Sequence, residues 1–263
     1  MSLTKQTTFY DEHPFDWVES YPGDERRRVI SPLLLQVIDA LPADAFVLDV
    51  GCGAGRVLSY LAYRGVRCMG LDRSAQAINI VSRRHGLRGV VADNRRLPLT
   101  GNIADLVISD GVVHHTGDPA KAFAENCRIV KPGGLLYLAV YRPGGRYEFL
   151  YTYPGWVIRQ GLRSGATRWI VHSTALPLYR FAHRVKSQGK ISPVGAKNLF
   201  YDYFASPEVA FLSRNMIAEY AEAQGMEVAT YDPNPKQNVH CFVLRKIARE
   251  ANRNGHRPPG PVA

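Results

Sequence analysis

A glycine-rich turn that directly follows a short apolar run is the feature that most constrains the fold of this 263-residue chain. The apolar run, residues 45–50, reads as a buried strand, and the turn is Gly51-Cys52-Gly53-Ala54-Gly55-Arg56. A helix is expected over 56–63. In an α/β sheet, such a turn lets the backbone approach a nucleotide-like ligand, and the helix N-terminus offers it free N–H groups. The sequence thus predicts a ligand site at the carboxyl end of the first strand.

Strands and helices then alternate along the chain. Apolar runs predict four more strands, at 66–71, 89–92, 103–109 and 135–141. Helices are expected from Ser74 to about His85, and from Asp118 to just before Lys131. This alternation indicates an α/β fold, with a parallel sheet covered by helices on both faces.

The alternation breaks after Tyr141 and returns in the C-terminal part, where a helix at 213–224 precedes strands at 226–231 and 240–245. We therefore divide the chain into an N-terminal arm and helix that act as a lid (1–43), a ligand-binding core (44–141), an inserted helical cap (142–205), the C-terminal part of the core sheet (206–247) and a disordered tail (248–263).

Composition narrows the class of protein. The formal net charge of +10 suits phosphates, anionic lipid or acidic small molecules, although a solvated Arg-rich surface explains it equally well. The four cysteines form no CxxC pair, so we expect no metal site or disulfide framework, and a reduced, cytoplasmic setting. No apolar run reaches the ~20 residues of a membrane span, and residues 1–16 lack the apolar core of a secretory signal.

The turn sequence and the acidic residues after neighbouring strands narrow the class of ligand that the site is expected to bind. The turn reads GxGxG followed by Arg56, where the dinucleotide fingerprint GxGxxG requires Gly or Ala, so a nicotinamide cofactor is disfavoured. Asp72 follows the second strand, where a carboxylate accepts hydrogen bonds from a ribose diol. Asp93 follows the third strand and is placed to accept an adenine amino group. An Asp in such a position is also a common helix cap or turn former.

Five segments in order carry a resemblance. They are Val47 to Arg56, Gly70 to Ser74, Asp93 with Arg96-Leu97-Pro98-Leu99, Asp105 to His115, and Lys131-Pro132-Gly133-Gly134. Together they resemble the successive motifs of class I, Rossmann-like methyltransferases that depend on S-adenosylmethionine, and within these the small-molecule "type 11" branch with its ubiquinone-biosynthesis-type and phosphoethanolamine-type enzymes. The resemblance covers about residues 44–141, with a weaker echo at 206–245.

The resemblance implies a seven-stranded sheet of order 3-2-1-4-5-7-6 with the last strand antiparallel and the helical cap inserted. It implies S-adenosylmethionine as cofactor, S-adenosylhomocysteine as product and no metal. The glycine turn would hold the methionine end, Asp72 the ribose and Asp93 the adenine. The full set of expected cofactor-binding residues is Asp49, Gly51, Cys52, Gly53, Gly55, Asp72, Arg73, Asp93, Asn94 and Asp110.

Two adjacent histidines are the candidates for acid–base chemistry. An ammonium or hydroxyl acceptor must lose a proton when it is methylated, and histidine suits that task near neutral pH. His114 and His115 lie just past the fourth strand, at the ligand edge of the sheet. In phosphoethanolamine-type enzymes, a histidine three residues before the acidic helix cap works with a lid tyrosine. The matching residues are His115, before Asp118, and Tyr10 in the arm. Alternatively, one histidine packs beneath the following helix and only the other faces the pocket.

The cap at 142–205 is expected to cover the acceptor, because it is rich in aromatic residues and arginines. Such a mixture suits an acidic or aromatic small molecule, a natural-product-like acceptor or a lipid headgroup, but it is also the composition of an ordinary core with a solvated surface. Tyr141, Arg142 and Tyr203 are the predicted substrate residues. A peripheral membrane contact is left open, and we expect a monomer or homodimer.

Three alternatives remain. The same fold acts on RNA in some tRNA-modifying methyltransferases with a similar His-His segment, but the chain has no appended RNA module or strong Lys-rich run, so nucleic acid is disfavoured. A protein that binds the cofactor without catalysis would keep the motifs for structure only. A nicotinamide-dependent oxidoreductase is weakened by Arg56.

Overall fold

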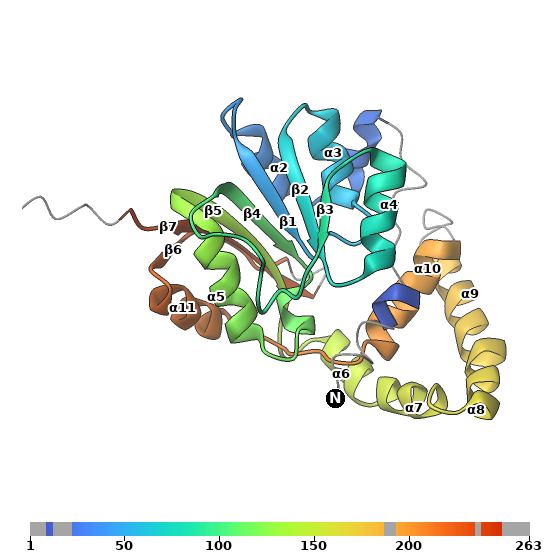
Figure 1. Ribbon diagram of the computed structural model, residues 1–263. Coiled ribbons are helices and arrows are strands. Elements are labelled where there is room, and N and C mark those ends of the chain that lie inside the picture. Colours follow the sequence, from blue (N-terminus) through green and yellow to red (C-terminus); the bar gives the residue numbers. More distant parts are fainter. Residues whose placement is uncertain (1–8, 13–22, 187–192, 235–237, 249–263) are drawn as a thin grey trace, which may run out of the picture.

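The computed structural model describes residues 9–12, 23–186, 193–234 and 238–248. Its centre is a seven-stranded sheet of order β3-β2-β1-β4-β5-β7-β6 (Figure 1). The strands are β1 (Phe46–Val50), β2 (Arg67–Asp72), β3 (Gly89–Val91), β4 (Ala104–Asp110), β5 (Val130–Tyr141), β6 (Met226–Asp232) and β7 (Val239–Lys246). Strand β7 runs antiparallel to both of its neighbours, and the other described pairings are parallel. The predicted strand order and the antiparallel last strand are confirmed.

Helices cover both faces of the sheet, as the buried strands require. On one face lie α2 (Pro32–Asp39) and α3 (Arg56–Tyr63), which share an apolar cluster with β1, β4 and β5, and the 3-10 helix η2 (Gly23–Val29) contacts α3. On the other face lie α5 (Pro119–Ile129) and α11 (Arg214–Ala223), which share the larger cluster. Helix α4 (Ala75–His85) contacts β2 and β3, and packs on α3 through Val81 and Leu58.

The helix starts follow from capping residues in the sequence. Ser74 accepts a hydrogen bond from Ala77 N at the start of α4, and Asp118 accepts one from Lys121 N at the start of α5. The helical region before the sheet is divided at Pro32: η2 ends at Val29, and α2 starts at Pro32 behind the cap Ser31. Strand β5 begins earlier than expected, at Val130, because Val130 pairs with Ala104 before a register shift restores the main ladder.

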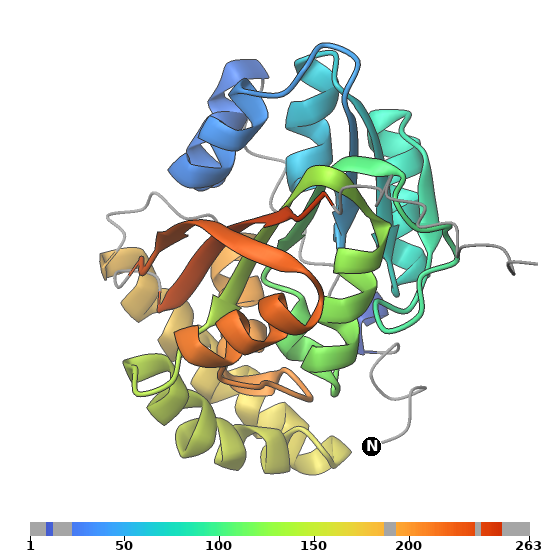
Figure 2. The ribbon, with the colours of Figure 1, turned by 90° about the vertical axis from the view of Figure 1, so that its left-hand side faces the viewer.

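The segment 142–205 is mostly helical where it is described, and it extends away from the sheet (Figures 1 and 2). It contains α6 (Arg146–Thr152), α7 (Pro154–Gly161), α8 (Gly165–Ile170), the π-helical turn η4 (Val171–Ala175), α9 (Leu176–Lys186), α10 (Pro193–Phe200) and a second π-helical turn, η5 (Tyr201–Ala205). We call this segment the cap. Its own apolar cluster includes Leu176, Phe200 and Phe204, and the arm residue Phe9 packs against it.

Part of the expected lid, at 1–8 and 13–22, and nearly all of the expected tail, at 249–263, fall outside the described residues. Of the arm, residues 9–12 form a short helical segment, and the tail is described only at residue 248. The assignments of 1–43 as a lid and of 248–263 as a disordered tail therefore stay predictions.

The central strand β1 gives a direct test of the core. Leu48 is fully buried and belongs to the larger apolar cluster. Because Leu48→Ala would leave a cavity there, it is expected to lower the free energy of unfolding by about 3 kcal/mol, measured by urea titration. The matched control Val228→Ala, at a position 41% exposed on β6, is expected to cost less than about 1 kcal/mol. Equal losses in the two variants would contradict this picture of the core.

Candidate functional site

A cavity of about 900 Å³ lies at the carboxyl ends of the strands, within the range of small-molecule sites. Its walls come from the glycine turn, the ends of β1, β2 and β4, the η2–α2 segment, the arm residue Tyr10 and the cap. Most of the predicted site residues line it: Tyr10, Asp49, Gly51, Cys52, Gly53, Asp72, Arg73, Asp93, Asn94, Asp110, His115, Tyr141 and Tyr203.

The glycine turn owes its shape to residues without side chains. Gly51, Gly53 and Gly55 all have positive φ, of 80°, 51° and 86°. A Cβ added to Gly51 would lie 2.3 Å from the side chain of Val112, so a side chain at this position would clash with the segment after β4. The turn is also fixed to β2, because Gly51 N donates to Leu71 O at 2.6 Å.

Asp72 joins the end of β2 to this turn. Its Oδ2 accepts a hydrogen bond from Gly53 N at 2.8 Å, and its Oδ1 accepts one from Ser74 N at 2.9 Å. Burial raises the pKa of Asp72, and these backbone N–H groups oppose the rise. Each carboxylate oxygen can accept a second hydrogen bond, so Asp72 keeps acceptor capacity towards the cavity.

Asp93 and Asn94, after β3, differ in how far they are already paired. Asp93 accepts hydrogen bonds from Arg95 N, Nε and a terminal guanidinium nitrogen, which lower its pKa. The side chain of Asn94 is 8% exposed and lines the cavity, and neither its oxygen nor its nitrogen has a hydrogen-bond partner among the described residues. Buried amides without partners are rare, so Asn94 is the stronger indication of a polar ligand.

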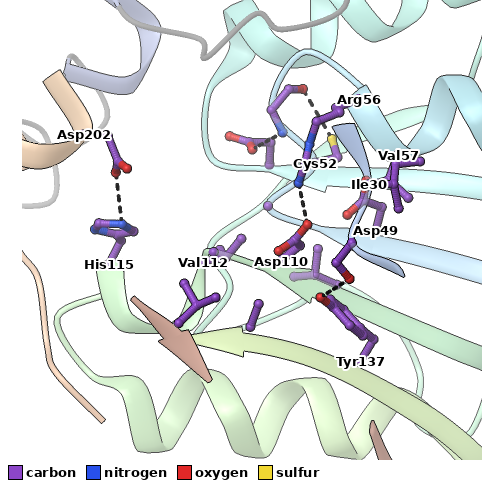
Figure 3. Close-up of a pocket in the computed structure, with 18 of the residues that line it drawn as sticks. Ile30, Asp49, Cys52, Arg56, Val57, Asp110, Val112, His115, Tyr137 and Asp202 are labelled. Atoms are coloured by element: carbon purple, nitrogen blue, oxygen red, sulfur yellow. Dashed lines mark hydrogen bonds and ion pairs between the residues drawn. The ribbon is translucent and has the colours of Figure 1, made fainter. Parts of the chain in front are cut away.

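Two further carboxylates, Asp49 and Asp110, close the base of the cavity together with Arg56 (Figure 3). The Arg56 guanidinium donates to Asp110 and to the backbone oxygen of Val29, so it ties α3 to β4 and to the segment before α2. Asp49 is 3% exposed, and burial, reinforced by Asp110 and Asp72 against Arg56, raises its pKa to about 7.

The arm residue Tyr10 forms part of the cavity wall. The Arg73 guanidinium lies 5.9 Å from the centre of its ring, and the adjacent Asp11 accepts a hydrogen bond from Ser74 Oγ at 2.6 Å. Burial, and then the nearby Asp202, raise the pKa of Tyr10 far above its usual value. Its phenol therefore stays protonated at neutral pH.

His115 meets a carboxylate that the sequence reading missed. Its Nε2 lies 3.5 Å from Asp202 Oδ1. This pair and the Arg56–Asp110 pair line different sides of the cavity (Figure 3). The Nδ1 of His115 lies 2.9 Å from the carbonyl oxygen of Glu208, which can only accept, so Nδ1 carries a proton. The hydroxyl of Tyr141 donates to the other oxygen of Asp202. The cap thus supplies a carboxylate to a histidine of the core.

Three predicted site residues do not line the cavity. His114 is 1% exposed and packs between the rings of His115 and Tyr141, and burial lowers its pKa well below the usual value. Gly55 faces α4, where a Cβ would lie 3.1 Å from His85. The Arg142 side chain lies beside Gly145, and the backbone N–H of Arg142 donates to Asn238 O. Of the two histidines, only His115 faces the cavity.

A further part of the cavity wall comes from the η2–α2 segment, β5 and β7, and no motif indicated it. Ser31 Oγ and Tyr137 Oη lie 2.8 Å apart, and Tyr137 Oη donates to Cys241 Sγ at 3.6 Å. The wall here combines the basic residues Arg27 and Arg28 with apolar residues, which are Ile30, Pro32, Leu35, Val57, Ala139 and Val239.

Asp202 and His183 are the cap residues that the sequence reading missed. His183, from α9, lines the cavity, and burial lowers its pKa. For Asp202 a signal existed, because it is the only acidic residue between Glu148 and Glu208. A lone carboxylate in a basic, aromatic segment needs a partner, and His115 is that partner.

Among residues 9–12, 23–186, 193–234 and 238–248, no group of three or more His, Cys, Asp or Glu side chains lies close enough together to hold a metal ion. The described helices include none with both the length and the apolar character needed to cross a membrane.

The chain is similar to known proteins both in sequence and in structure. Residues 48–138 match the family model described as "Methyltransferase domain". The ubiquinone biosynthesis O-methyltransferase of Hahella chejuensis is 35% identical over 136 residues, which cover 48% of this chain and 56% of that protein. The tRNA (carboxymethyluridine(34)-5-O)-methyltransferase of Arabidopsis thaliana is 34% identical over 115 residues, which cover 42% of this chain and 27% of that protein. The match thus spans less than two thirds of either relative.

The fold is similar to that of a SAM-dependent methyltransferase from Methanosarcina mazei, with a TM-score of 0.54 and 14% identity over 84% of this chain and 99% of the other. The family match, the sheet order and this similarity agree with the resemblance found in the sequence motifs. Residues 48–138 therefore match a methyltransferase domain, and the fold that contains them is similar to that of a SAM-dependent methyltransferase.

Proposed function

We propose that this protein transfers the methyl group of S-adenosylmethionine to an oxygen or nitrogen nucleophile of a small molecule, with His115 as the general base. The observation that carries the proposal is the joint presence, in one cavity, of unpartnered Asn94 and of His115 paired with Asp202. The first calls for a polar ligand at the cofactor end, and the second is an acid–base pair at the other end.

The cofactor end fits S-adenosylmethionine by the chemistry of its donor and acceptor groups. Asp72 would accept from the ribose hydroxyls, and the Asn94 amide would both donate to and accept from the adenine. Asp93 keeps acceptor capacity for the adenine amino group although Arg95 already pairs with it. Ionised Asp49, beside the glycine turn, would balance the positive charge at the methionine end.

When bound, the cofactor supplies a methyl group on a sulfonium, which is open to in-line attack. The chain has to position the nucleophile and remove its proton. His115 is set up for this, since its Nδ1 proton faces the Glu208 carbonyl oxygen and leaves the Nε2 lone pair free to accept. At 3.5 Å, Asp202 lies beyond hydrogen-bond length from Nε2 and does not block it, but it stabilises the imidazolium once the proton has moved.

Tyr10 and Tyr141 have supporting roles in this proposal. Tyr141 donates to Asp202 and so fixes the carboxylate that faces His115. Tyr10 remains a phenol, so it can donate a hydrogen bond to the acceptor but does not serve as a base at neutral pH. Tyr203 also lines this end of the cavity.

The part of the wall from η2, α2 and β5 suits an apolar or aromatic acceptor that also carries an acidic group. It combines apolar side chains such as Ile30 and Leu35 with Arg27, Arg28 and the Ser31–Tyr137 pair. A cavity of about 900 Å³ is within the range of sites that bind small molecules.

An RNA acceptor is the second candidate, because the similar Arabidopsis thaliana protein is a tRNA methyltransferase and the chain is basic. The arm residue Tyr10 and residues of the cap form part of the cavity wall, and a hollow walled on these sides favours the small molecule. Methylation of bulk tRNA by the purified protein, with binding that falls steeply with salt, would favour RNA instead.

Replacing the proposed base tests the chemistry. His115→Ala is expected to lower kcat by at least about 100-fold, measured as S-adenosylhomocysteine production with an accepted small molecule, because the proton acceptor is lost. The cofactor Kd is expected to stay unchanged. His114→Ala is the matched control, and near-normal turnover in His115→Ala would refute the assignment of the base.

Asp202 is proposed as a positioning residue, since it acts through His115. Asp202→Asn keeps an acceptor for Tyr141 but removes the charge, so kcat is expected to fall by about tenfold or more, with the cofactor Kd and Tm unchanged. Asp202→Glu is expected to restore part of kcat. A loss of Tm in step with kcat in Asp202→Asn would show a purely structural role.

The raised pKa of Asp49 predicts a pH-dependent affinity for the cationic cofactor. The carboxyl is mostly protonated below its pKa of about 7 and ionised above it, and the cation favours the ionised form. Affinity for S-adenosylmethionine is therefore expected to rise about tenfold from about pH 6 to about pH 8. Calorimetric titration should show this slope in the native protein and in Asp105→Asn, and its loss in Asp49→Asn. The same slope in Asp49→Asn would exclude Asp49 as its source.

A further inference from the structure

The outer side of the cap carries large apolar side chains that the methyl-transfer site does not use. Of the fifteen large apolar side chains that are exposed among the described residues, ten lie between residues 149 and 194. Helices α7, α8 and α9 form the edge of the molecule that lies away from the sheet (Figures 1 and 2). We call the exposed apolar and basic side chains of 149–186 the cap surface. Its apolar content exceeds that of single scattered surface residues, so a binding role is indicated.

One part of the cap surface is a shallow hollow on α6 and α7. Phe149, Tyr153, Trp156 and Val157 line it, and each is between 59% and 63% exposed. The ring centres of Phe149 and Tyr153 lie 5.1 Å apart, so the aromatic groups are clustered.

A second part is the outer face of α9. Leu178, Phe181 and Val185 follow one another at intervals of three and four residues, which places them on one side of the helix. They are 69%, 68% and 64% exposed. The inward residues Leu176 and Tyr179 belong to the core of the cap. Helix α9 is therefore apolar on both faces, and among the described residues only its inner face packs against other parts of the chain.

The charge of this region has a single sign. Between Glu148 and Asp202 the sequence has no acidic residue and eight basic ones, namely Arg159, Arg163, Arg168, Arg180, Arg184, Lys186, Lys190 and Lys197. The stretch thus contributes eight of the chain's ten net positive charges. Arg163, Arg168, Arg180 and Arg184 are exposed.

We propose that the cap surface binds the surface of an anionic phospholipid bilayer. Helices that lie in a membrane interface combine exposed Trp, Phe and Leu with arginines that reach anionic headgroups, and the cap surface has both. Trp156 and Trp169, 59% and 72% exposed, are of the residue type that concentrates at headgroup level.

Two other occupants fit the observations less well. A second copy of the chain would bring two strongly basic surfaces together, which like-charge repulsion opposes. RNA would satisfy the arginines but would leave aliphatic groups such as Leu178 and Val185 exposed, since nucleic acids are bound through phosphate contacts and stacking on aromatic rings. A bilayer satisfies both the charge and the aliphatic side chains.

The inference is independent of the proposed methyl transfer, but it bears on substrate access. Helix α9 carries the outward face described above, and on its inner side it supplies His183 to the cavity wall. Binding at the cap surface therefore places the cavity close to the lipid, and gives an apolar acceptor a short route to it.

Sedimentation with lipid vesicles tests the proposal on the full chain. We expect binding to vesicles of phosphatidylcholine with phosphatidylglycerol, release at high salt, and no binding to phosphatidylcholine alone. The double variant Leu178→Glu, Phe181→Glu is expected to bind at least about tenfold more weakly. The matched double variant Tyr63→Glu, Val228→Glu, at exposed positions outside the cap, is expected to bind as the native chain does.

Thermal unfolding of all three proteins shows whether each is folded, and a single replacement, Phe181→Glu, serves if the double variant is not. Any of four results would overturn the proposal: no binding to the anionic vesicles, equal binding by the cap variant, a dimer that the cap variant dissociates, or tighter binding to bulk tRNA that the cap variant loses. Cofactor binding, measured separately, reports on the proposed function and not on this surface.

Discussion

The crowding of carboxylates at one edge of the sheet is the constraint on which the rest of the site depends. Asp49, Asp72 and Asp110 come from the ends of three adjacent parallel strands, and the topology leaves them no other place. Arg56 partly neutralises them through its pair with Asp110, and the same guanidinium holds the backbone before α2. The charge left over at Asp49 and Asp72 suits a cationic ligand.

The proposed acid–base pair depends on a different condition, the docking of the cap on the core. His115 belongs to a turn after β4, whereas Asp202 belongs to a π-helical turn of the cap. Tyr147 strengthens this junction, because its hydroxyl donates to the backbone oxygen of Asp202. Since His115 and Asp202 pair only when the cap is in place, cap position and catalytic competence are coupled in this account.

The strands and helices of the core could be predicted from the sequence, because regular α/β alternation is compatible with few sheet topologies. Short apolar runs, helix caps such as Ser74 and Asp118, and the glycine turn fix each strand–helix unit locally, and the family motifs then imply the strand order. The place of Asp72 and Asn94 on the cavity wall could be foreseen for the same reason, since both follow predicted strands. The pairing of Arg56 with Asp110 required the register between β1 and β4, which no local pattern contains.

The structure of the cap could not be predicted from local sequence patterns. Its helices are short, two of its turns are π-helical, and its apolar residues point both inward and outward, so periodicity could not separate core from surface. Which of His114 and His115 faces the cavity depends on where Tyr141 packs. The contact of Asp202 with His115 could not be foreseen, because the two residues are 87 positions apart in the chain.

Calorimetric titration with S-adenosylhomocysteine, run in parallel with NAD, tests the central claim most directly, because it requires no knowledge of the acceptor. The account predicts saturable one-to-one binding of S-adenosylhomocysteine, weakened about tenfold or more in Asn94→Ala through loss of a buried hydrogen-bonding group, and no saturable binding of NAD. Binding of NAD without binding of S-adenosylhomocysteine would contradict it.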